Sequence, residues 1–382
     1  MAEWISKTLG EITLFITKGI PPKYVEEENQ NTVRVLNQKC NRNFEISYDE
    51  SRIHNALIKK VPEDKLLQYG DVLINSTGTG TAGRVAQLFN VPVPTTMDGH
   101  MILLRPIDEV DPLYYGYAVK SQQKKIESLA EGSTGQTEIN RQRLKDEIII
   151  TYPKGKMLQK AIGKFLFQID EKIRNNKRIN NNLEQQVSVL YQSCFEDFEI
   201  TNGICPENWS HQELSTIADI ASGKRPPVKS DTCNEKTPIS IVGAASVMGF
   251  TSEANHTDKI LVTGRVGTHG VIQRFNTPCW TSDNTLVITS PYYEFTNQIL
   301  HRIDYSSMNR GSTQPLITQG DMKKVVVLVP DEDTLAKFEK FAGSLMAKWE
   351  ANNNENVKLA SLRDTLLPKL ISGELDVSNI DL

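Results

Sequence analysis

The sequence predicts a mixed α+β protein made of two tandem domains, each followed by a long helix, and three observations support this. Motifs of the first half recur in the second half in the same order. Short apolar runs bounded by turn residues fill the front of each half. Each half then closes on a long stretch with apolar residues at three- and four-residue steps. We therefore predict domains over residues 1–153 and 201–330, with long helices in 154–200 and 331–382.

The duplication rests on landmarks that keep their order. The opening Trp4…Gly19-Ile20-Pro21-Pro22 matches Trp209…Lys224-Arg225-Pro226-Pro227 at the same spacing. Two glycine-containing pairs follow, Gly80–Gly83 with Gly267–Gly270 and Gly132–Gln136 with Gly311–Gln314. The spacing between landmarks drifts, which indicates that loops changed length around fixed elements. The period is domain-sized and exceeds that of solenoid repeats.

Each domain is expected to combine strands with one shorter helix. The expected strands are Val33–Leu36, Val72–Ile74 and Met101–Leu104 in the first domain, and Ile239–Val242, Ile260–Val262 and Thr285–Ile288 in the second. Helices are expected over residues 112–131 and 292–309, with Gly132 and Gly311 just past their ends. Tyr114, Tyr115 and Tyr117 open the first of these helices, where core packing is a better interpretation than base stacking.

The long helices are expected to bury their apolar stripes against each other as an antiparallel coiled coil with pseudo-two-fold symmetry. The stripe residues are Leu158, Ile162, Phe165, Ile169, Leu183 and Leu190 in the first helix, and Leu335, Phe338, Leu345, Trp349, Leu362 and Leu366 in the second. From Leu158 to Leu190 such a helix spans roughly 50 Å at about 1.5 Å per residue. Asparagines interrupt both stripes, at Asn175–Asn176 and Asn180–Asn182 and again at Asn352–Asn354 and Asn356. They indicate either a solvated polar face or a feature of the helix seam, namely a register device or a frayed midpoint. We favour the seam feature.

Composition excludes several classes of protein. The net charge is −4, so any DNA binding must use local basic groups or rely on a partner for phosphate attraction. The five cysteines contain no Cys-x-x-Cys pair, which gives no indication of a disulfide framework or a zinc site and suits a reducing cytoplasm. No apolar stretch is long enough to cross a membrane, and the first residues do not form a signal peptide.

One segment suggests an enzyme that binds a nucleotide. Gly78-Thr79-Gly80-Thr81-Ala82-Gly83 follows an expected strand and fits the dinucleotide fingerprint. That motif requires a helix directly afterwards, whereas residues 84–89 are followed by a proline-rich turn and suit the second strand of a hairpin. We find no other catalytic signature and no metal-ligand spacing, and so expect no catalytic residue, metal or cofactor in this chain.

The layout resembles the specificity subunit of type I restriction-modification systems over essentially the whole chain. The resemblance is carried by Leu362–Leu375, Gly70–Ser76, Ile241–Ala244, Ile260–Gly267 and the two glycine-serine-threonine landmarks. It implies that each domain is a target recognition domain that reads half of a bipartite, gapped site in double-stranded DNA. It also implies that the helices set the spacing and dock two adenine-N6 methyltransferase subunits, while an ATP-driven restriction subunit joins separately. S-adenosylmethionine, ATP and magnesium would then be bound by the partners.

Base readout favours arginine or lysine for guanine and asparagine or glutamine for adenine. The candidates are Lys18, Lys23, Arg34, Arg84 and Gln136 in the first domain, and Lys224, Arg225, Arg265, His269, Arg274 and Gln314 in the second. Each could instead be a solvated or ion-paired surface residue. A coiled-coil adaptor that binds proteins and no DNA is the alternative function, which the near-neutral charge favours and the two large end domains disfavour.

Overall fold

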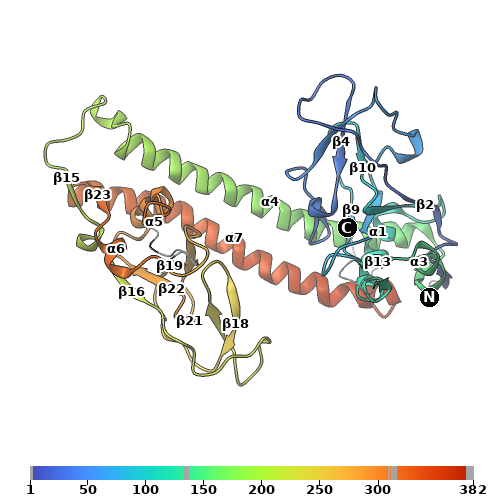
Figure 1. The fold of residues 1–382 in the computed structure, drawn as a ribbon. Helices are drawn as coiled ribbons and strands as arrows, with labels where there is room; N and C mark the ends of the chain where they lie inside the picture. Colours follow the sequence, from blue (N-terminus) through green and yellow to red (C-terminus); the bar gives the residue numbers. More distant parts are fainter. Residues whose placement is uncertain (1–2, 133–136, 309, 311–315, 376–382) are drawn as a thin grey trace. The chain divides into compact units, whose positions relative to one another are not determined.

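The computed structural model describes residues 3–132, 137–308, 310 and 316–375 (Figure 1). By its internal contacts the chain divides into two units. Unit 1 comprises residues 1–175 and 354–382, and unit 2 comprises residues 176–353. Each unit therefore contains one mixed α+β domain and a part of each long helix.

Unit 1 is built around two four-stranded sheets. Its strands are β1 (Trp4–Thr8), β2 (Thr13–Lys18), β3 (Tyr24–Val25), β4 (Thr32–Leu36), β5 (Asn41–Arg42), β6 (Glu45–Ile46), β7 (Arg52–Asn55), β8 (Val72–Asn75), β9 (Val85–Gln87), β10 (Thr95–Met97), β11 (Met101–Pro106), β12 (Ala130–Glu131), β13 (Glu138–Ile139) and β14 (Ile149–Pro153). Its helices are α1 (Pro112–Ser121), α2 (Gln123–Ser128) and α3 (Arg141–Glu147). The sheets run β2-β11-β8-β9 and β10-β4-β7-β3, and β1 pairs with β14.

Unit 2 repeats this plan with fewer strands among the described residues. Its strands are β15 (Ser210–Glu213), β16 (Asp219–Ser222), β17 (Ile239–Val242), β18 (Val247–Thr251), β19 (Ile260–Gly264), β20 (Gln273–Phe275), β21 (Cys279–Thr281), β22 (Thr285–Thr289) and β23 (Val326–Val329). Its shorter helices are α5 (Tyr293–Arg302) and α6 (Gln319–Lys323). The sheets run β16-β22-β19-β20 and β18-β17-β21, and β15 pairs with β23.

The two strand orders show that the duplication extends to topology. The sheet β2-β11-β8-β9 has the same order and antiparallel pairing as β16-β22-β19-β20. The second sheet of each unit contains one parallel pair, β4 with β10 in unit 1 and β17 with β21 in unit 2. Gly19 and Gly223 occupy the same tight crossing, where an added Cβ would lie 2.0 Å from the Asp98 carbonyl oxygen and 2.1 Å from that of Ser282. The predicted mixed fold and its strands are confirmed.

The long helices are α4 (Lys156–Phe195) and α7 (Glu332–Ser372). Both helices continue without a break through their asparagines, so the prediction of a frayed midpoint is wrong. In unit 2, Asn180 and Asn352 are buried and bond across the two helices, which is also inconsistent with a solvated face for this pair. Contacts run antiparallel within each unit, as the pairs Lys172–Glu355 and Arg363–Asp170 show in unit 1.

Most stripe residues pack into a hydrophobic core of their own unit. In unit 1, Ile162 and Ile169 are buried, while Leu158, Phe165 and Leu366 pack against the core partly exposed. In unit 2, Leu183, Leu335 and Phe338 are buried, and Leu190, Leu345 and Trp349 pack against the core partly exposed. Leu362 differs, because its side chain is 46% exposed and so lies outside the helix seam.

The shorter helices differ from prediction at their ends. The expected helix over 112–131 is two helices, α1 and α2, followed by β12. Gly132 therefore follows a strand rather than a helix, and Gly311 lies outside the described residues. The expected helix over 292–309 ends at Arg302, because Ile303 adopts extended backbone. Tyr114, Tyr115 and Tyr117 are fully buried in the core, as predicted.

Candidate nucleic-acid interface

The turn that follows β8 in unit 1 gathers polar groups from four segments. Thr77 lies at its start and forms an isolated bridge with Glu138. The Gln38 Nε2 donates to the Thr77 carbonyl oxygen at 2.6 Å, and the His100 Nδ1 lies 3.0 Å from the Thr77 hydroxyl. Lys18 at the end of β2 forms an ion pair with Glu138. The hairpin is thus fixed to the neighbouring loops by side-chain hydrogen bonds.

The glycines of this hairpin serve packing. β9 follows Gly83 and pairs antiparallel with β8, so no helix follows the fingerprint and the nucleotide-binding interpretation is wrong. Gly83 has φ +88°, and a Cβ added there would lie 2.6 Å from the Glu127 Cα. Only glycine meets both demands, which lets the hairpin approach α2 closely.

Unit 2 builds the same turn with different side chains. Backbone hydrogen bonds identify the equivalent positions: Ser76 N donates to His100 O at 2.8 Å, and Arg265 N donates to Asn284 O at 2.8 Å. Ser76 O accepts from Ile139 N at 2.8 Å, and Arg265 O accepts from Ile317 N at 3.0 Å. One frame therefore carries a serine hydroxyl in unit 1 and an arginine guanidinium in unit 2.

Two basic side chains of the unit 2 turn have unused hydrogen-bonding atoms. The buried Arg265 Nε and His269 Nε2 have no hydrogen-bond partner within the described residues. The His269 Nδ1 lies 3.0 Å from the Gly264 carbonyl oxygen, which orients the ring. Buried polar atoms are normally paired, so these atoms are suited to a ligand group that completes the site.

The other candidates in unit 1 are mostly engaged with neighbours. Lys23 is exposed and lies before β3. Arg34 on β4 pairs with Glu28 at 2.6 Å. Arg84 donates to the Gly80 carbonyl oxygen at 3.0 Å across the hairpin turn. The Arg34–Glu28 ion pair can exchange its carboxylate for phosphate, since a surface ion pair contributes little stability.

In unit 2, Lys224 and Arg225 are exposed just after β16. The Lys224 carbonyl oxygen accepts from the Trp280 Nε1 at 2.7 Å, which fixes the backbone and leaves the ammonium in solvent. Gln136 and Gln314 lie outside the described residues.

Arg274 has a structural environment that the sequence did not reveal. Its guanidinium forms a buried ion pair with Glu294 at 2.6 Å and lies 5.0 Å from the Tyr293 ring centroid. Burial alone would lower the pKa of Arg274, but the hydrogen bond and charge of Glu294 hold it above its ordinary value. Because this pair belongs to the core of unit 2, we exclude Arg274 from the proposed interface.

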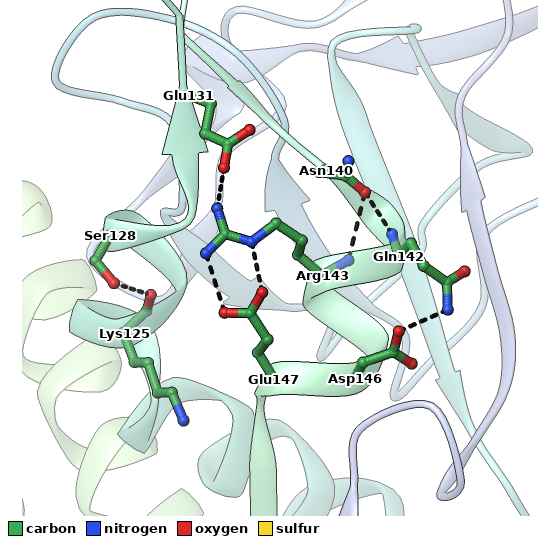
Figure 2. Close-up of polar contacts among 8 residues, drawn as sticks. All are labelled: Lys125, Ser128, Glu131, Asn140, Gln142, Arg143, Asp146 and Glu147. Atoms are coloured by element: carbon green, nitrogen blue, oxygen red, sulfur yellow. Dashed lines mark hydrogen bonds and ion pairs between the residues drawn. The ribbon is translucent and has the colours of Figure 1, made fainter.

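Figure 2 shows a network around α3 that contains basic residues missed in the sequence. Arg143 reaches both Glu131 of β12 and Glu147 of α3, and its hydrogen bonds and charge lower the pKa of Glu147. Asn140 caps the helix by accepting from Gln142 N at 2.8 Å and Arg143 N at 3.3 Å. The network holds α3 against β12, beside a cavity of about 610 Å³.

Arg141 and Lys145 line this cavity from one face of α3, together with Lys18. Residues four apart share a helix face, so the Arg-x-x-x-Lys spacing was the signal in the sequence. Unit 2 has a lysine, Lys323, at the corresponding end of α6 after the Thr318 cap. The Tyr24–Arg52 pair was also missed, with the Arg52 guanidinium 3.5 Å from the ring centroid.

The described residues form neither a metal-binding cluster nor a membrane-spanning helix. No group of three or more histidine, cysteine, aspartate or glutamate side chains there is arranged to hold a metal ion. None of the helices in the described part of the chain is long and apolar enough to span a bilayer.

Comparisons with known proteins agree on one family. Residues 1–185 match the model of the type I restriction modification DNA specificity domain. The chain is 25% identical to the type I restriction enzyme MjaIX specificity subunit of Methanocaldococcus jannaschii, over 99% of this chain and 95% of that protein. It is also 25% identical to a putative type I specificity subunit of Mycoplasma genitalium, over 70% of this chain and 72% of that protein. The crystal structure of a type I S subunit from M. genitalium superposes with a TM-score of 0.63 at 20% identity, over 99% of this chain and 97% of that chain, and so shares the fold.

Proposed function

The chain belongs to the family of type I restriction-modification specificity subunits, and from this premise we propose that each of its two mixed domains reads one half of a bipartite, gapped DNA site. The chain itself performs no chemistry in this proposal. Methylation and cleavage belong to partner subunits, which bind S-adenosylmethionine, ATP and magnesium.

One observation carries the proposal: a single backbone frame presents different side chains in the two units. Ser76 and Arg265 make the same pair of backbone hydrogen bonds, yet the Ser76 side chain is fully buried whereas Arg265 carries a partly exposed guanidinium. Arginine is the commonest partner of guanine, whereas the buried serine leaves base contacts in unit 1 to other side chains. Two readers of equal geometry and unequal chemistry suit a site whose halves differ in sequence.

The net charge of −4 requires that phosphate attraction be local or shared. Lys18, Arg141 and Lys145 meet at one cavity in unit 1. Lys224 and Arg225 are exposed in unit 2. We propose that these groups position the DNA backbone and that the methyltransferase subunits supply most of the remaining positive charge.

The long helices are proposed to dock the methyltransferases. Val189 and Phe341 expose 65% and 54% of their surface in unit 2, and Val357 exposes 71% in unit 1. Apolar side chains exposed on helices that already bury one stripe offer a second face to a partner. The duplicated plan favours two copies of one partner.

The test is to coexpress the full chain with a cognate type I methyltransferase subunit and map N6-methylated adenines across the host genome by single-molecule sequencing. We expect a bipartite motif with a fixed unread gap. A stable complex without any methylation motif would overturn the proposal in favour of the adaptor without DNA readout.

A further inference from the structure

Unit 2 contains a cavity of about 690 Å³ outside the proposed DNA-reading turn. One wall is α4, which contributes Asn181, Glu184, Gln185 and Ser188 at positions that share a helix face. The opposite walls come from α5 and β20, and Met346 and Trp349 of α7 complete the lining. A cavity of this size is in the range of specific binding sites.

The cavity contains a buried polar side chain that the fold leaves unused. Asn297 of α5 is 4% exposed, and its Oδ1 has no hydrogen-bond partner within the described residues. The Arg274 Nε, which also lines the cavity, is likewise buried without a partner there. A buried polar atom left unpaired costs about 1–3 kcal/mol. These groups are therefore suited to a bound molecule that supplies hydrogen bonds.

The chemistry of the lining favours an uncharged, amide-like ligand. Both guanidiniums in the cavity are neutralised by carboxylates, Arg274 by Glu294 at 2.6 Å and Arg302 by Glu196 at 2.6 Å. The carboxylate of the lining itself, Glu184, is exposed to solvent on α4. Amide side chains account for much of the remaining polar lining, namely Asn181, Gln185, Gln273, Asn297 and Gln298. Amides both donate and accept, which matches the alternating N–H and C=O groups of a polypeptide.

We propose that this cavity binds an extended segment of the methyltransferase subunit through its peptide groups; this inference rests on the proposed function. A helical segment would have its own backbone hydrogen bonds satisfied and would leave Asn297 unpaired. An extended segment exposes free N–H and C=O groups to the amide lining. Met346 and Trp349 add apolar surface for one side chain of the segment.

The test uses the full chain and the purified methyltransferase subunit. Asn297→Ala is expected to weaken the complex about 10-fold, because one buried hydrogen bond is lost. Gln186→Ala is the matched control, since Gln186 neighbours Gln185 on α4 but is absent from the lining. Circular dichroism should show the same helix content and melting temperature for both variants and the parent.

A photocrosslinking residue at Gln185 provides a second measurement that does not depend on binding strength. It should capture one short stretch of the methyltransferase, identified by mass spectrometry, while the same residue at Gln186 captures that stretch at least several-fold less. Equal capture at the two positions, or unchanged affinity of a folded Asn297→Ala variant, would overturn this inference and leave the proposed function standing. If the parent chain formed no complex, both proposals would fall.

Discussion

At the scale of single residues, Glu339 shows how burial changes the chemistry of a capping carboxylate. It lies on α7 and accepts from the backbone N–H of Phe295 at 2.7 Å and of Glu294 at 3.1 Å, which caps the start of α5. Burial raises its pKa to about 7, and the nearby Glu294 carboxylate adds to this effect, while the two backbone hydrogen bonds and Arg274 oppose it. Between a pH of about 4.5 and about 7, the folded state therefore retains a proton at Glu339 that the unfolded state, with an ordinary glutamate, has released.

This difference predicts a pH dependence of stability. As pH rises from about 4.5 to about 7, the unfolded chain ionises at residue 339 before the folded chain does, so the free energy of unfolding falls over this window. Glu339→Gln should remove this fall in the free energy of unfolding, which is on the order of 1–3 kcal/mol. The amide should also weaken one hydrogen bond, and this loss should be the same at every pH. Urea unfolding at several pH values measures the slope. Glu332→Gln, an exposed change on the same helix, should keep the parental slope, and a variant at residue 339 with an unchanged slope would contradict the assignment.

Residue types in the sequence predicted basic candidates but not their environments. Arg265 and Arg274 look alike in the sequence, yet one lies at the turn after β19 and the other is paired in the core. The ion pair of Arg274 joins β20 to α5, two elements that become neighbours only when the sheet has formed. Arg141 and Lys145 had a usable signal, because their spacing on α3 places them on one helix face.

At the scale of elements, the asparagine layer between α4 and α7 in unit 2 fixes how these helices meet. Asn180 donates to the Trp349 carbonyl oxygen at 3.2 Å and to Asn353 Oδ1 at 2.9 Å, and it accepts from Asn352 at 2.8 Å. A buried polar layer satisfies its hydrogen bonds in one register only, as a single asparagine does in coiled coils. The layer thus selects one alignment of two long apolar stripes.

A double-mutant cycle tests this layer. Asn180→Leu should destabilise the chain by about 1–3 kcal/mol, because it leaves the Asn352 amide buried without its partner. Asn180→Leu combined with Asn352→Leu should recover much of that loss, since two apolar groups replace two polar ones. Thermal unfolding of the four proteins gives the coupling energy, which we expect to be at least about 0.5 kcal/mol. Simple additivity of the two changes would show that the pair does not act as a unit.

The elements themselves were largely predictable, whereas their pairing was not. Apolar periodicity located α4 and α7, and apolar runs located β8, β11, β19 and β22. The pairing of β1 with β14 joins the two ends of the first domain, and no local pattern encodes such a contact. The duplication partly makes up for this missing information on strand pairing, because one strand order accounts for both domains.

At the scale of the whole molecule, the proposal that one chain carries two similar readers makes modular recognition testable. Arg265→Ala should relax one half of the methylated motif and leave the other half and the gap unchanged, since a good base contact contributes about 1–3 kcal/mol of discrimination. Arg84→Ala, at the corresponding hairpin of the first domain, should affect the opposite half. Genome-wide mapping of methylated adenines reads both halves in each variant. Equal loss in both halves from either change would show that the two domains do not recognise DNA independently, because a change confined to one reader would then have altered the complex as a whole.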